Sequence, residues 1–495
     1  MFLLYISQWQ AYSEPVQPAI NDKGEFADMS KDNRWTTYDK KQLKDLNKLA
    51  EDYKKFLTAA KTEREAVVEV TKRIEKAGYR NLETVVKNGE TLKAGDKVYA
   101  VWMKKTMAIF TIGNEKLEKG LRILGAHIDS PRLDIKQVPL YEDTEMVFLD
   151  THYYGGVKKY QWTATPLAIH GVIAKKDGSV AEVKIGEDKD DPIFCVTDLL
   201  IHLSKDQMAK KVAEAIEGEN LDLLIGSQPM VFDKKTKDAD KKDPVKKQIL
   251  AILKEKYDIE EDDFLSAELE IVPAGAARDL GLDRSMIGAY GHDDRVCAFS
   301  SLDAFLRVEN PEYTSCCLLT DKEEIGSVGA TGAQSRFFEN TVAELLECCG
   351  QFSELALRRT LASSRMLSSD VSAAFDPLYA AAYEKRNSAY FGHGIVYNKY
   401  TGARGKSGSN DANAEYFAWV RRVMDDADVA FQTAELGKVD VGGGGTIAYI
   451  SALYGMNVVD AGVAVLNMHA PLEVVSKSDL YEARNAYAAF LKAVQ

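Results

Sequence analysis

Residues 122–134 read RILGAHIDSPRLD, and this segment decides the fold class. Its first part is a mostly apolar run typical of a short buried β-strand, and His127 and Asp129 follow directly. Because side chains alternate along an extended chain, both residues point the same way, so the carboxylate can hold the imidazole in one tautomer. In open α/β sheets, ligands bind at the carboxyl ends of strands. The segment therefore predicts an α/β fold with a functional site at this strand end.

The sequence on both sides of this strand alternates between helical and strand-like patterns. Residues 38–76 have the apolar spacing of two helices with a break near residues 60–62. Further strands are predicted at 98–111, 315–320 and 456–465, and further helices at 296–306, 411–424 and 478–494. This alternation predicts an α/β/α sandwich built from both ends of the chain.

The middle of the chain has a different texture. Short β-rich runs are predicted at 146–149, 160–164, 167–174 and 180–185, separated by Gly155-Gly156 and Asp177-Gly178. Residues 232–248 are nearly all charged and are expected to form a solvated loop. We therefore expect an α/β catalytic domain, residues 1–134 and 277–495, interrupted by an inserted β-rich domain, residues 135–276.

Composition excludes several classes of protein. The chain has 495 residues, with 63 basic and 76 acidic side chains, for a net charge of −13. Proteins that bind nucleic acids or anionic membranes need a positively charged surface, so neither a nucleic acid nor a membrane is expected as a partner. No apolar run is long enough to span a membrane, and Met1–Ile6 is interpreted as neither a signal peptide nor a span. The six cysteines form no C-x-x-C framework, which favours a reduced, cytoplasmic setting.

Four further short segments carry metal-ligating residue types. They are His292–Arg295, Asp321–Glu324, Ser368–Asp370 and Met468–Ala470. Together with His127 they supply the histidines and carboxylates that a pair of Zn²⁺ ions needs if one carboxylate bridges them. The adjacent pair Glu323-Glu324 could provide one ligand and one general base. Taken singly, each motif also has an ordinary structural explanation. The glutamate pair could be a solvated acidic pair, Asp370 could cap a helix, and His469 could be a packed core histidine.

The combination of these motifs resembles a known family. The motifs are Gly125–Asp134, Asp293–Arg295, Glu323–Ser327, Ser369–Asp370 and Asn467–His469. Together they are similar to the aspartyl aminopeptidase family of dinuclear metallo-aminopeptidases, over roughly residues 38–495. The resemblance implies that the inserted domain is a dimerisation domain. It also implies a homo-oligomer built from dimers, with a dodecamer as one candidate size.

The resemblance also assigns roles at the site. His127 and Asp370 would complete one metal site, Glu324 and His469 the other, and Asp293 would bridge them, with Asp294 as the alternative bridge. The cofactor would be two divalent ions, zinc first, with cobalt or manganese as alternatives. Asp129 would orient His127, and Glu323 would be the general base. His202, in an apolar run of the inserted domain, would reach into a neighbouring subunit's active site. A single histidine in such a run is more often a packed residue without a catalytic role.

The substrate side departs from the family pattern. After Asp370, Ala373 and Asp376 stand where the family has histidines, and an aspartate in that pocket would repel an acidic N-terminal residue. Gly445 and Thr446, at the end of a glycine run, suit close approach to a peptide backbone. Lys399 lies near a segment that contacts substrate in the family.

The expected function is metal-dependent hydrolysis of the N-terminal residue of peptides. Two alternatives remain open at this stage. One is a di-zinc deacylase or carboxypeptidase on the same framework. The other is a non-enzymatic assembly or cargo protein with a vestigial metal site.

Overall fold

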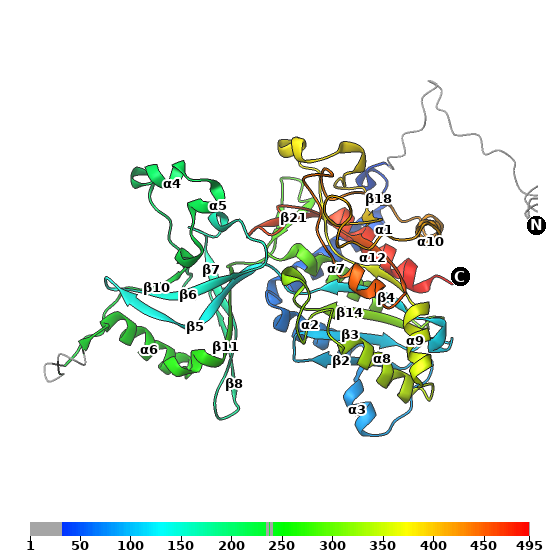
Figure 1. Ribbon diagram of the computed structural model, residues 1–495, viewed down its shortest axis with the longest axis horizontal. Coiled ribbons are helices and arrows are strands. Elements are labelled where there is room, and N and C mark those ends of the chain that lie inside the picture. The colour runs from blue at the N-terminus through cyan, green and yellow to red at the C-terminus, as the bar shows by residue number, and fades with distance from the viewer. Residues whose placement is uncertain (1–31, 234–236, 238–240, 495) are drawn as a thin grey trace, which may run out of the picture.

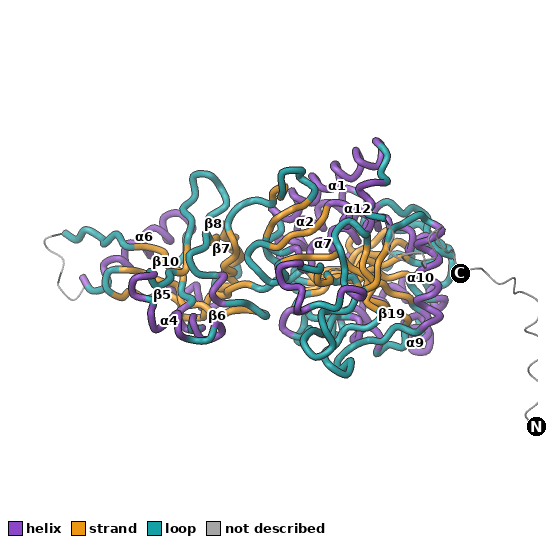
Figure 2. Tube along the Cα trace, turned by 90° about the horizontal axis from the view of Figure 1, so that it is seen from above, coloured by secondary structure: helices purple, strands orange, loops and turns teal. Residues whose placement is uncertain are grey.

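The computed structural model describes residues 32–233, 237 and 241–494. The predictions for Met1–Ile6 lie outside these residues. The described chain forms two lobes (Figures 1 and 2). Of the described residues, 32–131 and 274–494 form the large lobe, and those within 132–273 form the small lobe. Within the described part of the chain, no helix is both long enough and apolar enough to cross a membrane.

A nine-stranded sheet runs through the large lobe (Figure 1). Its strands, in spatial order, are β1 (Arg80–Asn81), β2 (Lys97–Trp102), β3 (Thr106–Thr111), β14 (Ser315–Thr320), β4 (Arg122–His127), β15 (Arg365–Ser368), β19 (Asn457–Gly462), β17 (Ile395–Asn398) and β18 (Phe431–Thr433). Strand β4 is central, and it is parallel to both neighbours, β14 and β15. The carboxyl ends of these three strands therefore meet at one edge of the sheet, where ligands bind in open α/β folds.

Helices cover both faces of this sheet. One face packs against α1 (Lys40–Ala59), α2 (Glu63–Lys76), α7 (His292–Leu306), α10 (Ala414–Asp426) and α12 (Lys477–Lys492). The other packs against α3 (Leu82–Lys87), α8 (Phe337–Cys348), α9 (Glu354–Ser363) and α11 (Ala448–Ala452). Alternation along β4 supplies both cores, because Leu124 joins the first and Ile123 the second. The predicted α/β fold class is confirmed.

A smaller sheet completes the large lobe. Its strands, in spatial order, are β12 (Arg278–Leu280), β13 (Met286–Ala289), β21 (Glu473–Ser476), β20 (Ala464–Leu466) and β16 (Ser372–Ala373). The turn between β20 and β21 contains His469, and β13 leads into α7, which begins with His292, Asp293 and Asp294. This sheet therefore brings two predicted ligand segments together.

The small lobe is built on a seven-stranded antiparallel sheet. Its strands, in spatial order, are β8 (Val180–Ile185), β7 (Leu167–Ala174), β11 (Ala267–Pro273), β5 (Arg132–Asp143), β6 (Met146–Tyr154), β10 (Leu223–Gly226) and β9 (Cys195–Val196). Its helices are α4 (Lys205–Ala209), α5 (Val212–Ala215) and α6 (Pro244–Tyr257). Strand β5 begins five residues after β4 ends, so the chain passes from the metal-ligand segment directly into this lobe.

Two local predictions in the small lobe are wrong. Residues 160–164 are not a strand, because Lys159–Gln161 form a 3₁₀ helix, η3. The charged segment 232–248 is not a loop throughout, since α6 begins at Pro244. Val245 is fully buried, and Ile249, Leu250 and Leu253 pack against the lobe core, so the lysines conceal the start of an amphipathic helix.

A buried charge cluster joins the two lobes. His170 of the small lobe is fully buried, with Nδ1 2.8 Å from Glu65 Oε1 and Nε2 3.1 Å from Glu187 Oε1. Lys61 of the large lobe donates to Glu187 at 2.5 Å and to the carbonyl of Pro273 at 2.7 Å. Burial alone would lower the pKa of His170, but Glu187 and Glu65 raise it above its ordinary value. The cluster therefore favours a charged imidazole that holds the lobes together.

Replacing His170 with alanine should destabilise the protein by about 3 kcal/mol, because Glu65 loses the imidazole that pairs with it and Glu187 keeps only Lys61. Urea denaturation at neutral pH measures this loss. The matched control is His152→Ala, since His152 is an exposed histidine of the same lobe. Equal stability of the two variants would contradict a role for the cluster in joining the lobes.

Candidate metal centre

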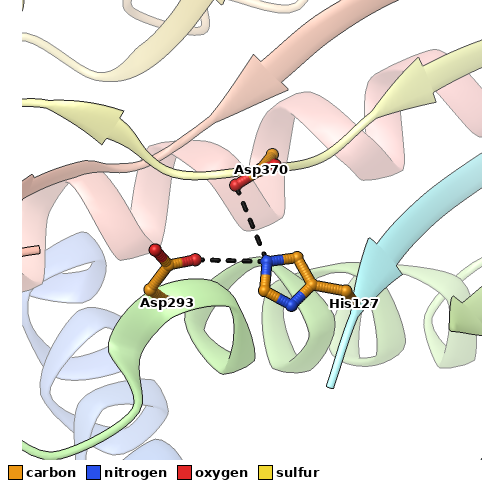
Figure 3. Close-up of side chains that lie close together, drawn as sticks. All are labelled: His127, Asp293 and Asp370. Atoms are coloured by element: carbon orange, nitrogen blue, oxygen red, sulfur yellow. Dashed lines mark ion pairs between the residues drawn. The ribbon is translucent and has the colours of Figure 1, made fainter. Parts of the chain in front are cut away.

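His127 is the last residue of β4, and its two ring nitrogens have different neighbours. Nδ1 lies 3.1 Å from the backbone oxygen of Asp129 and 3.3 Å from its Oδ1. A carbonyl oxygen accepts only, so this contact places the ring proton on Nδ1. Nε2 lies 3.2 Å from Asp293 Oδ1 and 3.8 Å from Asp370 Oδ1 (Figure 3). His127 thus presents a free lone pair to two carboxylates.

His469 has the same arrangement in the turn between β20 and β21. Its Nδ1 lies 2.9 Å from the backbone oxygen of Gly156, which belongs to the small lobe. Its Nε2 lies 3.2 Å from Asp293 Oδ2 and 3.4 Å from Glu324 Oε2. Both histidines therefore direct Nε2 at carboxylates while a backbone carbonyl holds Nδ1.

Asp293 is the carboxylate common to both histidines. Its Oδ1 faces His127 and its Oδ2 faces His469. The donor atoms form two groups, His127–Asp293–Asp370 and Asp293–Glu324–His469, and within each group all ligand atoms lie within 4.8 Å of one another. Asp294 is also fully buried but belongs to neither group.

The donor atoms converge on the same space but do not form hydrogen bonds with one another, as expected of ligands for cations. Asp293 Oδ1 and Glu324 Oε1 are buried and have no hydrogen-bond partner, although Asp293 Oδ1 is close to His127 Nε2. Converging lone pairs at such distances, without hydrogen-bond geometry, are expected of ligands that share a metal ion. Histidine nitrogens and carboxylate oxygens are a donor set that suits zinc. Each group could hold one divalent ion.

Burial and charge dominate the electrostatics of this cluster. Burial raises the pKa values of Glu324 and Asp370 well above the ordinary range, and neighbouring carboxylates add to the effect. Burial would also raise the pKa of Asp293, but the two histidines outweigh it and lower that pKa. A buried cluster with more carboxylates than histidines favours positively charged ligands.

Glu323 lies beside the donors but belongs to neither group. It begins a 3₁₀ helix, η8 (Glu323–Ile325), just after β14. Burial raises its pKa to about 7, and Asp293 and Asp129 add to the shift. The backbone N–H groups of Glu323 and Glu324 both donate to Asp129, at 3.1 and 3.2 Å. Asp129 therefore positions His127 and the two glutamates together.

Three supporting residues were missed from the sequence. Tyr154 of β6 donates to Asp129 Oδ2 at 2.8 Å. Glu473 accepts from the backbone N–H of Asp293 at 3.0 Å and of His469 at 2.7 Å. Gly156 holds His469, and a Cβ there would lie 3.3 Å from its Nδ1. For Glu473, the sequence signal was a single glutamate before the apolar pair Val474-Val475, which is buried. For Gly156, the signal was the Gly-Gly pair, which was interpreted as a turn.

A cavity of about 500 Å³ opens beside the donors. Asp293, Glu323, Glu324, Asp370 and His469 line it on one side. The other lining residues are small, neutral or apolar: Gly156, Gly326, Ser327, Val371, Ser372, Asn398, Thr401, Leu436, Gly443, Gly444, Gly445, Thr446, Tyr449 and Met468. No lysine or arginine is among them.

Comparison with known proteins identifies the family. The model of the family described as "Aminopeptidase I zinc metalloprotease (M18)" matches residues 56–491. The chain belongs to the M18 family. It is a zinc metallo-aminopeptidase, a hydrolase that acts on peptides. This finding confirms the resemblance drawn from the motifs and favours an aminopeptidase over the deacylase, carboxypeptidase and non-enzymatic alternatives.

Relatives cover nearly the whole M18 aminopeptidase. It is 60% identical over 459 residues to the probable M18 family aminopeptidase 1 of Clostridium acetobutylicum, covering 93% of this chain and 97% of that one. The crystal structure of an M18 aminopeptidase from Thermotoga maritima matches with a TM-score of 0.88 at 42% identity, covering 94% and 100% of the two chains. The S. cerevisiae mApe1 dodecamer matches at 20% identity with a TM-score of 0.71, covering 90% and 97%, and shares the fold.

The predicted substrate residues of this M18 aminopeptidase divide into two pairs. Gly445 and Thr446 line the cavity. Asp376 does not, because its side chain caps the 3₁₀ helix η9 (Pro377–Ala382) and accepts from the N–H of Leu378 at 2.9 Å. Lys399 is also outside the lining and pairs with Asp411 at 2.5 Å. The electrostatic argument from Asp376 therefore has no support in this geometry.

His202 lies apart from both donor groups. It is exposed, in the 3₁₀ helix η4 (Ile201–Leu203) of the small lobe, close in sequence to α4. Its neighbours Leu199, Leu200, Ile201 and Leu203 are exposed by 46–70%. An exposed apolar run of this kind is typical of a contact surface.

Proposed function

We propose that this M18 aminopeptidase works through a dinuclear zinc centre. His127 and Asp370 would hold one ion, Glu324 and His469 would hold the other, and Asp293 would be the ligand common to both. The observation that carries this proposal is the position of Asp293, whose two oxygens face one histidine each. Cobalt or manganese would suit the same donors, because availability as well as ligand type decides which metal is bound.

The chain's own residues then account for peptide hydrolysis. When bound, zinc supplies Lewis acidity that polarises the scissile carbonyl and acidifies the attacking water. Glu323, which lines the cavity but ligates nothing, takes a proton from that water and passes it to the leaving amine. Asp129 orients His127, and Glu473 holds the backbone of Asp293 and His469 in place. A metal ion or a nearby carboxylate of the cavity would hold the substrate's α-amino group, which limits cleavage to the N-terminal residue.

The same cavity favours neutral N-terminal residues. Its lining contains no lysine or arginine that could pair with an acidic side chain. We expect kcat/KM for leucyl and alanyl substrates to exceed that for aspartyl substrates by about tenfold or more, because an aspartate side chain would lose its hydration without gaining a side-chain cation.

A panel of aminoacyl chromogenic substrates, assayed with Zn²⁺, Co²⁺ and Mn²⁺, tests both the function and this preference. N-acetylated leucine derivatives serve as the control, because a blocked amine should abolish cleavage by an aminopeptidase. Hydrolysis of the blocked substrates at comparable rates would contradict the proposed reaction, and faster hydrolysis of aspartyl substrates would contradict the preference.

We also assign the small lobe a role in assembly. Residues 135–276 would form an inserted dimerisation domain, with the exposed apolar run around His202 against a second copy of the chain. Dimers of this kind would build a larger homo-oligomer, and the S. cerevisiae relative is itself a dodecamer. The six cysteines are all free, which suits a cytoplasmic location.

His202 should act in the active site of the partner subunit. A Glu323→Gln protein and a His202→Phe protein should each have low activity, and mixing them should restore part of it when subunits exchange. Recovery arises because some hybrid interfaces pair an intact catalytic cavity with an intact His202. Native mass spectrometry confirms the exchange, and exchange without recovery would place His202 outside the active site.

A further inference from the structure

A second cavity adjoins the catalytic one. It has a volume of about 390 Å³ and is lined by residues from two loops, 400–406 and 435–442. We call it the cationic pocket. Thr401 and Leu436 line both cavities, so the pocket opens beside the catalytic centre. The N–H of Gly402 donates to the carbonyl of Gly444 at 2.7 Å, which joins the pocket's first loop to the glycine run of the catalytic cavity.

Close packing holds these loops in register. A Cβ at Gly443 would lie 2.0 Å from the carbonyl oxygen of Gly402, and Gly443 has a φ of +112°, so only glycine fits there. The segment 403–407 closes as a turn through paired backbone contacts between Ala403 and Ser407. The pocket is therefore a built feature of the fold rather than a chance gap between loops.

Positively charged side chains predominate in this pocket. Arg404, Lys406 and Lys438 line it, against the single carboxylate of Glu435. Glu435 already accepts from the hydroxyl of Tyr400 at 2.6 Å. Lys406 lies 3.7 Å from the centre of the Tyr400 ring and 3.0 Å from Asp411 Oδ2. Among the described residues, Arg404 and Lys438 have no side-chain partner.

From this arrangement we infer that the cationic pocket is a subsite for a carboxylate of the peptide substrate, bound by Arg404 and Lys438. The inference rests on the proposed function. The catalytic centre holds the α-amino end of a peptide, and the adjoining cations attract a negative group further along it. Two groups beyond the scissile bond have this chemistry: the C-terminal carboxylate of a short peptide and an acidic side chain.

Peptide pairs that differ by one charge distinguish these sources. Leu-Ala-Ala is compared with its C-terminal amide, and Leu-Ala-Asp-amide with Leu-Ala-Asn-amide. In at least one pair, we expect kcat/KM for the charged member to be about three- to tenfold higher, the effect of one or two exposed ion pairs. The preference should shrink as salt concentration rises, because exposed charges are screened.

The variant Arg404→Gln/Lys438→Gln should bring these ratios close to one. The control is Arg386→Gln, an exposed arginine outside both cavities, which should keep them. Thermal melting checks that the double variant is folded. The inference is overturned if neither pair shows a preference for charge, or if the preference persists in the double variant.

Leucine p-nitroanilide separates this inference from the proposed function. This substrate has no carboxylate, so its hydrolysis reports the catalytic centre alone. Wild-type protein that cleaves it without any charge preference in the peptide pairs overturns only the carboxylate subsite. Wild-type protein that cleaves neither the anilide nor the peptides overturns the proposed function instead.

Discussion

Replacing Glu323 with glutamine is expected to lower kcat by about 10²- to 10⁴-fold, the usual cost of losing a general base. Glutamine keeps the shape of the side chain but cannot accept the proton of the attacking water. Because Glu323 belongs to neither donor group, the variant should bind as much metal as the wild type. Steady-state kinetics and elemental analysis of the same preparation measure the two quantities together.

The matched control for this experiment is Glu347→Gln, an exposed glutamate on α8. It should retain wild-type activity and metal content. If Glu323→Gln kept activity within about tenfold of the wild type, Glu323 would not be the base. A loss of metal along with activity would instead make Glu323 a ligand.

Replacing Asp293 with asparagine is expected to reduce bound metal from the proposed two ions per chain to one or none. An amide has one carbonyl oxygen and one NH₂ group, so it cannot offer an oxygen to each donor group. The loss of activity should exceed the 10- to 100-fold that follows removal of a residue that only supports a metal ligand. Elemental analysis after gel filtration gives the stoichiometry.

The neighbouring aspartate provides an isosteric control. Asp294 is buried beside Asp293 but belongs to neither donor group, so Asp294→Asn should retain both ions. The reverse result, with metal lost from Asp294→Asn and kept by Asp293→Asn, would make Asp294 the bridge. Full metal content in both variants would refute a bridging aspartate altogether.

The sequence alone predicted the fold class, and it also indicated which residues we propose as metal ligands. His127 could be placed at a strand end because the apolar run before it is local, and the alternation of side chains is a property of any strand. The glutamate pair after the apolar strand 315–320 could be placed for the same reason. These inferences depend on short segments, in which neighbouring residues determine the backbone conformation.

Local signals do not determine the direction of a side chain that has two possible roles. Asp376 follows the ligand segment closely, yet its side chain caps η9 instead of facing the cavity. Lys399 was placed near the substrate, but it pairs with Asp411. A sequence shows that a charged residue is close to a site along the chain, but not which way its side chain turns.

Only the tertiary structure decided how distant segments share the site. Asp293 lies between His127 and His469, which are 342 positions apart in the sequence (469 − 127). The parallel register of β4 and the turn after β20 bring the two histidines to the same edge of the large sheet. Glu473 and Tyr154 support the site through contacts with backbone or side-chain groups far away in the sequence. Gly156 does so from the small lobe, whose packing against the large lobe no local pattern encodes. Residue types and local periodicity thus identified the candidate donors, whereas long-range packing determined which of them lie close together and which cavity they line.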